Sequence, residues 1–354
     1  MEQELIFTNH VEETIDRLVQ KANPDRLFIL VDDNISLNVL PRLQSISKAV
    51  GAARLIIVSP GDRNKSLESL SYIWKDLSDH GATRHSLLIN LGGGMITDMG
   101  SFAAATFKRG IKFINIPTTL LAAVDASVGG KTGINFNGLK NEIGVFRNAE
   151  TVIISSIFFN TLPAEEIKSG YAEMLKHSLL SDAKTFHDLI KKDILELDPD
   201  SMLKLIKENV KVKSDIVEKD PTEKNLRKAL NLGHTVGHAF ESLAMKRNAP
   251  IPHGYAVAYG MVVELVLSTI KQQFPSETLR KFASYVYKNY RAFAFDCKDY
   301  DFLIQSMHHD KKNLSADKIN CSLLKTVGHV ILDCTVSEDE IRASLDIYRE
   351  ELMK

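Results

Sequence analysis

Three histidines in the second half of the sequence each lie next to a glycine, and their spacing is typical of metal ligands. His234 and His238 are four residues apart, which places both imidazoles on one face of a helix, and His253 begins the next predicted helix. Glu173 shares a face of an earlier predicted helix with Lys176. Two histidines and a carboxylate from three helices, with positions left open for substrate, are the usual composition of a catalytic zinc site.

Two other interpretations of these histidines need weighing. The residues lack the His-Glu-x-x-His order of zinc proteases, so peptide hydrolysis is not predicted. Histidines of a protein core also bond to backbone carbonyl groups without binding a metal, and this alternative stays open for His234 and His238. Three glycine-associated histidines in succession favour the metal site over it.

A run of three glycines, Gly92 to Gly94, follows a predicted buried strand and opens a helix whose first turn carries Thr97 and Asp98. Glycine lets the backbone approach a phosphate closely, and a helix N-terminus offers free N–H groups and a favourable dipole. The run therefore predicts a pyrophosphate site. Its spacing differs from the Gly-x-Gly-x-x-Gly of the standard dinucleotide fold, so a plain tight turn is the alternative.

Polar residues also follow the other strands of the first half, where parallel sheets bind ligands. Asp32 and Asn34 follow the first strand, and an acid at this position commonly holds a ribose hydroxyl. Such an acid favours NAD over its 2′-phosphorylated form, although capping a helix is an equal alternative for Asp32. The remaining polar residues of this rim are Asp62, Lys65, Thr118 and Thr119.

Residues 125–141 include Lys131, Lys140 and Asn141 and are too rich in glycine and polar residues to predict a regular element. Lysines held by glycine turns often bind anions. Any one of these basic residues, taken alone, is interpreted as a solvated surface charge. Their occurrence in the same sequence as the metal motif is what favours an anion site. The further basic candidates are Arg109, Lys176, Arg227, Lys311 and Lys312.

The elements that must position these residues differ between the two halves of the sequence. Strands at 26–31, 54–58, 86–91, 112–116 and 151–154 alternate with helices near 10–22, 37–50, 66–80 and 97–107. This alternation predicts an α/β fold with a mostly parallel sheet covered on both faces. The second half predicts helices at 164–181, 201–218, 225–246, 255–273, 277–290 and 337–353, and one hairpin of strands 318–324 and 329–332. We expect an α/β domain at 1–161, a mainly helical domain at 162–354, and a site between them.

The bulk composition excludes several classes of protein. With 354 residues the chain is long enough for two domains, and its 44 basic and 45 acidic residues give a formal charge of −1, which attracts neither nucleic acid nor an anionic membrane. Three widely spaced cysteines predict neither a disulfide framework nor a zinc finger. Since the N-terminus lacks a signal-peptide pattern and no apolar run approaches about 20 residues, we expect a cytoplasmic protein.

Taken together, the motifs resemble the 3-dehydroquinate synthase family of sugar-phosphate cyclases, in order over nearly the whole chain. The stretches that carry the resemblance are GGGMITDMGSFAAATFKRG, PTTLLAAVDASVGGKTGIN, LKNEIGVF, TLPAEEIKSGYAEMLKH, LNLGHTVGHAFES, HGYAVAYGM and DKK. It implies a Rossmann-like NAD domain, a helical metal domain and a homodimer. The implied activity is the conversion of 3-deoxy-D-arabino-heptulosonate 7-phosphate to 3-dehydroquinate and phosphate, in the shikimate pathway toward aromatic amino acids.

The resemblance also assigns roles to residues by position. It implies a divalent metal, zinc or cobalt, on Glu173, His234 and His253. It implies substrate contacts from Arg109, Lys131, Lys140, Asn141, Lys176, Arg227, Asn231 and a lysine of the pair Lys311 and Lys312. It implies NAD contacts from Asp32, Asn34, Asp62, Lys65, Gly93, Gly94, Asp98, Thr118, Thr119, Asp125, Phe158, Thr161, Leu162 and Glu166. His238, one helical turn from His234, is placed to stabilise charge or transfer protons.

The implied reaction gives these residues defined work. The metal would acidify the C5 hydroxyl of the substrate, and NAD would take a hydride and return it after phosphate leaves by β-elimination. Ring opening and an intramolecular aldol addition would complete the product, so NAD is a catalytic cofactor. One departure concerns Tyr255, which stands where the family usually has glutamate. We expect changed hydrogen bonding near the metal there rather than lost activity.

Three other functions stay open. A cyclase that makes an inosose or a valiolone would share the fold and the metal, but Arg227, Asn231 and His238 together favour a substrate with a carboxylate. An iron-dependent alcohol or glycerol dehydrogenase would share the glycine turn and the histidine helix, but it needs no lysine-rich loop at 125–141. A binding protein without activity would have no need of the intact ligand set.

Overall fold

The computed structural model describes residues 3–308 and 318–353. The chain divides into two compact units: the first comprises Met1–Pro163 and Leu197–Val210, and the second comprises Ala164–Glu196 and Lys211–Lys354. Helix α9 (Pro199–Lys219) therefore has its first turns in the first unit and its remainder in the second.

The first unit contains a six-stranded sheet of order β1-β8-β5-β4-β2-β3, in which all neighbouring strands run parallel. Its strands are β1 (Glu4–Phe7), β2 (Leu27–Asp32), β3 (Arg54–Val58), β4 (Leu87–Gly92), β5 (Lys112–Pro117) and β8 (Thr151–Ile154). The five predicted strands and the parallel α/β fold are confirmed. The edge strand β1, which is only partly buried, was not predicted. Since β2, β4 and β5 are neighbours, their carboxyl ends lie at one edge of the sheet.

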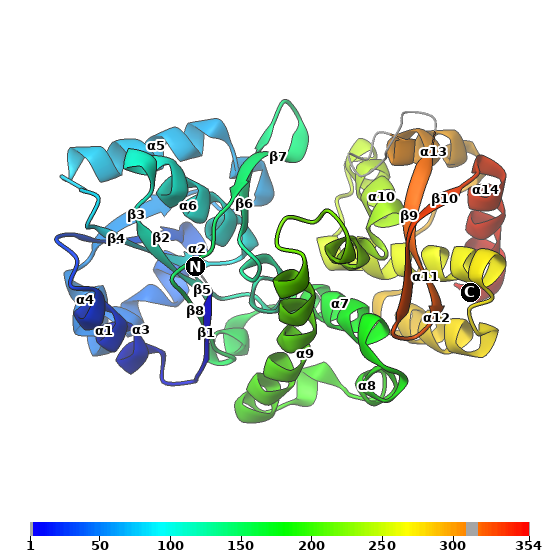
Figure 1. Cartoon of the computed structure of the whole chain (residues 1–354), viewed down its shortest axis with the longest axis horizontal. Coiled ribbons are helices and arrows are strands. Elements are labelled where there is room, and N and C mark those ends of the chain that lie inside the picture. Colours follow the sequence, from blue (N-terminus) through cyan, green and yellow to red (C-terminus); the bar gives the residue numbers. More distant parts are fainter. Residues whose placement is uncertain (1–2, 309–317, 354) are drawn as a thin grey trace. The chain divides into compact units, whose positions relative to one another are not determined.

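Helices cover both faces of this sheet, with α5 and α6 on one side and α1, α3 and α4 on the other (Figure 1). They are α1 (Val11–Ala22), α2 (Asp33–Asn38), α3 (Leu40–Ile46), α4 (Lys48–Ala52), α5 (Leu67–Asp79) and α6 (Gly94–Thr106). The prediction of one helix over 37–50 is wrong, because α2, α3 and α4 replace it. Ser47 interrupts the helical path by adopting an extended conformation and capping α4 with its side chain.

The expectation that residues 125–141 form no regular element is also wrong. Strands β6 (Lys131–Phe136) and β7 (Leu139–Phe146) pair as an antiparallel hairpin. The two residues between them, Asn137 and Gly138, have φ values of 49° and 77°. Asn-Gly with two positive φ angles is the preferred two-residue hairpin turn, because its twist matches that of the strands. This dipeptide was the signal that could have predicted the hairpin.

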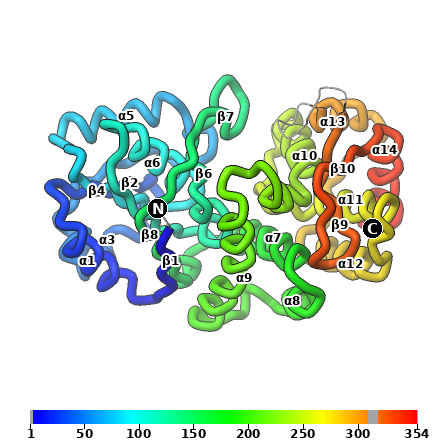
Figure 2. The backbone as a smooth tube through the Cα atoms, in the orientation of Figure 1, coloured from blue at the N-terminus to red at the C-terminus, as the bar shows by residue number. Residues whose placement is uncertain are grey.

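The second unit is mainly helical and surrounds one central helix, α11 (His253–Gln272), which packs against α7, α10, α12, α14 and β9 (Figure 2). The other helices are α7 (Ala164–Ser181), α8 (Ala183–Leu189), α10 (His234–Lys246), α12 (Ser276–Tyr290), α13 (Tyr300–His308) and α14 (Glu338–Ile347). Strands β9 (Ile319–Thr326) and β10 (His329–Val336) form the predicted hairpin. The single helix predicted over 225–246 is wrong: the short 3-10 helix η6 (Leu226–Asn231) ends before α10 begins.

Helix α11 corrects one expectation about apolar segments. It is long and apolar enough by composition to cross a membrane, with a mean hydropathy of 1.3 over its most apolar window. Of that window, 78% is buried inside the protein. A helix that is apolar on all sides and packed on all sides is the core helix of a large domain.

Candidate functional site

The carboxylate of Glu173 lies at the centre of the predicted metal site in the second unit. It belongs to α7, is fully buried, and pairs with the ammonium of Lys176 one helical turn further along. Among the described residues, no hydrogen-bond donor reaches Glu173 Oε1. Because an ionised carboxylate is costly to bury without partners, a cation next to Oε1 would stabilise this site.

Both predicted histidine ligands turn the same ring atom toward this oxygen. The Nε2 atoms of His234 and His253 lie 3.5 and 3.6 Å from Glu173 Oε1. On the other side of its ring, His234 Nδ1 lies 3.2 Å from the carbonyl oxygen of Leu232. His253 Nδ1 lies 3.2 Å from Glu241 Oε2. An imidazole whose Nδ1–H is hydrogen-bonded presents the lone pair of Nε2 as a ligand.

These distances fit a shared divalent ion better than a set of hydrogen bonds. Metal–ligand bonds of about 2.1 Å in a tetrahedral zinc site place two ligand atoms about 3.4 Å apart. The alternative, that His234 and His238 are core imidazoles bonded to carbonyl groups, accounts for the Nδ1 contact of His234 but not for the approach of its Nε2 to Glu173. Glu173, His234 and His253 therefore fit the predicted metal, and the three ligand atoms lie within 4.8 Å of one another.

Contacts between α10 and α11 hold the histidines in place. Gly233 has a φ of 81°, and α10 begins at the next residue, His234. The carboxylate of Glu264, fully buried on α11, accepts hydrogen bonds from the backbone N–H of Gly233 at 2.6 Å and of Val236 at 3.2 Å. An anion at a helix N-terminus satisfies free N–H groups and interacts favourably with the helix dipole. Glu264 thus fixes the end of α10 that carries His234.

The predicted substrate residues of the second unit lie on elements next to this site. His238 has its ring centroid 5.5 Å from that of His234 and 5.9 Å from that of His253, as the four-residue spacing predicted. Arg227, on η6, is almost fully buried and donates from Nη1 to the carbonyl of Pro221 at 2.7 Å. Asn231 ends the same 3-10 helix. Lys311 and Lys312 lie outside the described residues, so their substrate role stays a prediction.

In the first unit, the glycine run forms the predicted junction of strand and helix. β4 ends at Gly92, and Gly93 precedes the first residue of α6, Gly94. A Cβ on Gly93 would lie 3.1 Å from Thr119 Cγ2, so glycine keeps the junction open beside that side chain. The backbone N–H of Thr118 donates to the carbonyl of Gly92 at 3.0 Å, while the buried Thr118 hydroxyl has no hydrogen-bond partner among the described residues. An unpartnered polar atom beside a helix N-terminus fits a bound phosphate group.

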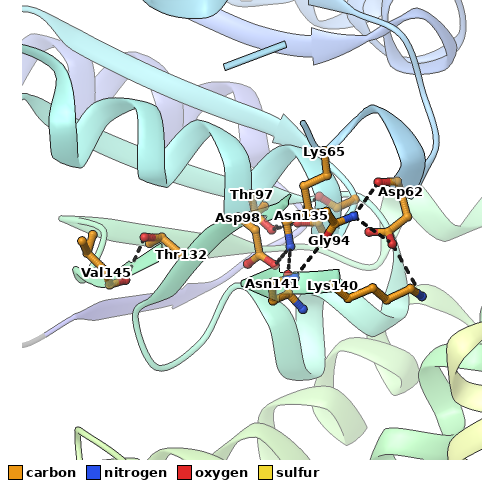
Figure 3. Close-up of polar contacts among 11 residues, drawn as sticks. Asp62, Lys65, Gly94, Thr97, Asp98, Thr132, Asn135, Lys140, Asn141 and Val145 are labelled. Atoms are coloured by element: carbon orange, nitrogen blue, oxygen red, sulfur yellow. Dashed lines mark hydrogen bonds and ion pairs between the residues drawn. The ribbon is translucent and has the colours of Figure 1, made fainter. Parts of the chain in front are cut away.

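A nearly buried lysine joins three of the other predicted residues. Lys65 Nζ donates to Asp98 Oδ2 at 2.6 Å and to Asn141 Oδ1 (Figure 3). Lys140 Nζ lies 3.5 Å from Asp62 Oδ2. Asn135, which was not predicted, connects these pairs: its side chain donates to Asp62 and accepts from the N–H of Asn141 at 2.9 Å. The β6–β7 hairpin therefore brings Asn141, and with it the neighbouring Lys140, to the part of α6 that carries Asp98.

Asp32 both caps a helix and lies at the predicted ribose position. It ends β2, and Oδ1 accepts the N–H of Ile35 at 2.9 Å at the start of α2. Burial raises the pKa of the Asp32 carboxyl, while hydrogen bonds from the N–H groups of Ile35 and Asn34 oppose this rise. The capping contact is observed, and the ribose contact stays a prediction.

Two variants separate the two roles of Asp32. Asp32→Ser keeps a capping oxygen but removes the carboxylate, so we expect unfolding free energy within about 0.5 kcal/mol of the parent. Its NAD affinity should fall roughly 10- to 100-fold, because a hydrogen bond to a charged group is lost. Asp32→Ala should lose the same affinity and about 1 kcal/mol of stability. Isothermal titration calorimetry measures the NAD affinity, and urea unfolding measures the stability. If the serine variant bound NAD as tightly as the parent, Asp32 would act only as a helix cap.

The remaining predicted residues occupy several separate elements. Arg109 ends the turn after α6, at the opposite end of that helix from Gly94. Its substrate role stays a prediction, as do the roles of the others. Of these, Asp125 lies on a π-helical turn, Lys131 on β6, Phe158 and Thr161 on the 3-10 helix η4 (Ile157–Thr161), Leu162 directly after it, and Glu166 in the first turn of α7 of the second unit.

Comparison with known proteins decides the family. Models of the N-terminal and C-terminal parts of 3-dehydroquinate synthase match residues 55–169 and 170–313. A 3-dehydroquinate synthase of Parabacteroides distasonis is 48% identical over 99% of the chain and 98% of its own length. The chain belongs to the 3-dehydroquinate synthase family. A family member from Clostridium tetani is 33% identical over 95% of the chain and 91% of its own length. The predicted family and enzyme class are confirmed.

Solved structures of more distant proteins share the fold. A 2-epi-5-epi-valiolone synthase of Streptomyces hygroscopicus, solved with NAD+ and Zn2+ bound, is 22% identical over 99% of the chain and 97% of its own, with a TM-score of 0.87. An iron-containing alcohol dehydrogenase of Corynebacterium glutamicum is 13% identical over 98% and 95%, with a TM-score of 0.67. At these identities the likeness of the solved structures concerns the fold alone.

Proposed function

We propose that the protein converts 3-deoxy-D-arabino-heptulosonate 7-phosphate to 3-dehydroquinate and phosphate, with NAD and one divalent metal as cofactors. The observation that carries the proposal is the triangle of Glu173 Oε1, His234 Nε2 and His253 Nε2 in a chain of this family. The valiolone synthase of the same fold was solved with NAD+ and Zn2+, which supports the cofactor assignment. Zinc and cobalt both suit two imidazoles and a carboxylate.

When bound, the metal supplies a Lewis acid for a substrate hydroxyl, and NAD supplies a reversible hydride acceptor. The residues of this chain bind and orient the substrate. Lys176 and Arg227 place two nearly buried positive charges in the second unit, where electrostatic attraction to phosphate or carboxylate is screened less than at the surface. We assign proton transfer to His238, because its half-buried ring lies within 6 Å of both ligand rings.

Lys65 has a positioning role in this proposal. Its ammonium joins Asp98, the fifth residue of α6, to Asn141 of the hairpin. A lysine bonded to two acceptors holds the hairpin amide next to the glycine junction, where a nucleotide phosphate would bind. The hairpin would then contribute Lys140 to an anion on the same side.

One assay tests the proposal against the competing reaction classes. The purified protein is incubated with heptulosonate 7-phosphate, a trace of NAD and zinc or cobalt, and phosphate release and reduced NAD are followed together. We expect many equivalents of phosphate per NAD, no lasting accumulation of reduced NAD, and loss of the activity in excess chelator. Formation of stoichiometric reduced NAD without phosphate release would indicate a dehydrogenase and not a synthase. Turnover only with a sugar phosphate that lacks the carboxylate would indicate an inosose or valiolone cyclase.

We further propose that the protein is a cytoplasmic homodimer, as the resemblance implies. Its formal charge of −1 gives no basis for a nucleic-acid or membrane partner. Sedimentation equilibrium of the purified protein tests the oligomeric state, with a mass of twice 39.5 kDa as the expected result.

A further inference from the structure

Glu241 makes a contact at the metal site that the proposed function does not use. It lies on α10, and its side chain is nearly buried, with a relative exposure of 8%. Its Oε2 atom lies 3.2 Å from His253 Nδ1, across from the Nε2 atom that faces Glu173. Glu241 follows His234 by seven residues, which is two helical turns, so both side chains project from the same face of α10.

The chemistry of the two groups fixes where the proton of this contact lies. An ionised carboxylate only accepts hydrogen bonds, so His253 Nδ1 must carry the hydrogen that binds Glu241. A neutral imidazole has one N–H, and Nε2 of His253 is then left with a lone pair. That lone pair faces Glu173 Oε1 at 3.6 Å. Without an acceptor at Nδ1, the ring would distribute its proton between both nitrogens and turn more freely.

We infer that Glu241 is a positioning residue that holds His253 in the tautomer and ring orientation required for binding the divalent metal. The inference rests on the proposed function, because it concerns the same metal site. Glu241 also links two of the ligands: helix α10 carries His234 and, through Glu241, orients His253 of α11. A single helix thereby governs the direction of two of the three ligand atoms.

A second use of Glu241 has to be separated from this one. His238, Glu241 and His253 also offer ligand atoms within 4.8 Å of one another, so Glu241 could itself bind the ion. The Glu173 triangle is the better site. Glu173 Oε1 receives no hydrogen bond from the described residues, whereas Glu241 Oε2 already accepts one from His253. Replacing Glu241 by glutamine separates the two roles. A glutamine side chain can still accept the hydrogen bond from His253, but it is a poor ligand for zinc.

The test measures the zinc affinity of the full-length, metal-free protein by competition with a chromophoric chelator. Glu241→Ala should weaken zinc binding roughly 10- to 100-fold, as is usual when the partner of a ligating histidine is removed. Glu241→Gln should recover most of that loss and bind zinc within about five-fold of the parent, because its carbonyl oxygen still accepts from Nδ1. Ser242→Ala is the matched control. Ser242 is the next residue of α10, and within residues 3–308 and 318–353 its hydroxyl bonds only to the carbonyl of His238, at 2.9 Å.

Thermal unfolding of the metal-free variants supplies the second measurement. We expect the midpoints of Glu241→Ala and Ser242→Ala to fall together, so that the difference in zinc affinity reports on the ligand and not on the fold. Parental affinity in Glu241→Ala would overturn the inference. Equal loss in the alanine and glutamine variants would also overturn it, in favour of direct ligation. If the parent protein itself bound no zinc or cobalt, the proposed function would fail instead.

Discussion

Replacing His253 by alanine is expected to reduce turnover by at least about 1,000-fold, because the metal loses one of only three protein ligands and with it the Lewis acid. The bound metal should fall well below one ion per chain, measured by atomic emission after dialysis. NAD binding should change little, since the glycine junction, Lys65 and Asp98 all belong to the first unit. Fluorescence titration with NAD checks this part of the prediction.

The matched control is His329→Ala, which removes an exposed imidazole from β10 of the same unit. It should retain the metal, the turnover and the NAD affinity of the parent. Full metal content in the His253 variant would remove this residue from the site. Equal loss in both variants would trace the effect to the unit as a whole rather than to the ligand.

Gly260→Ala is expected to lower the free energy of unfolding by roughly 3 kcal/mol or more and to release the metal at the same time. In an exposed helix the same change would stabilise the protein by about 1 kcal/mol, because alanine is the better helix former. Here the sign reverses because α11 approaches α10 too closely for a side chain. A Cβ on Gly260 would overlap the carbonyl oxygen of Gly233 and lie 2.6 Å from the backbone nitrogen of Gly237. Backbone atoms cannot rotate away, so α10 and His234 must shift.

Guanidinium unfolding and metal analysis test this prediction together. Gly51→Ala serves as the control, because Gly51 is exposed on α4 and its added Cβ would come no closer than 3.2 Å to any neighbour, the carbonyl oxygen of Gln44. We expect the control to stay within about 1 kcal/mol of the parent and to keep its metal. If Gly260→Ala behaved like the control, the close approach of α10 and α11 would not be needed for the site.

Much of the first unit could be predicted from the sequence, because the signals were local. Each buried strand is a short apolar run between helical patterns, and β3 and β8 have the predicted bounds. Errors arose where a local signal was brief or was overlooked. Ser47 splits a helical pattern, and Asn137-Gly138 makes a hairpin out of a glycine-rich stretch. Gly233, with its positive φ, lies between the end of the 3-10 helix and the start of α10 at His234.

The histidines of the metal site show the limit of prediction from sequence. Residue type and spacing alone determined that His234 and His238 share a helical face, that His253 begins another helix, and that Glu173 and Lys176 lie one turn apart. Only the tertiary structure decided that both Nε2 atoms face the same oxygen of Glu173. The same holds for the groups that orient them, Glu241 and Glu264, which come from neighbouring helices. The direction in which a ring nitrogen points depends on how helices that are distant in the sequence pack together. A local pattern of residues does not predict that packing.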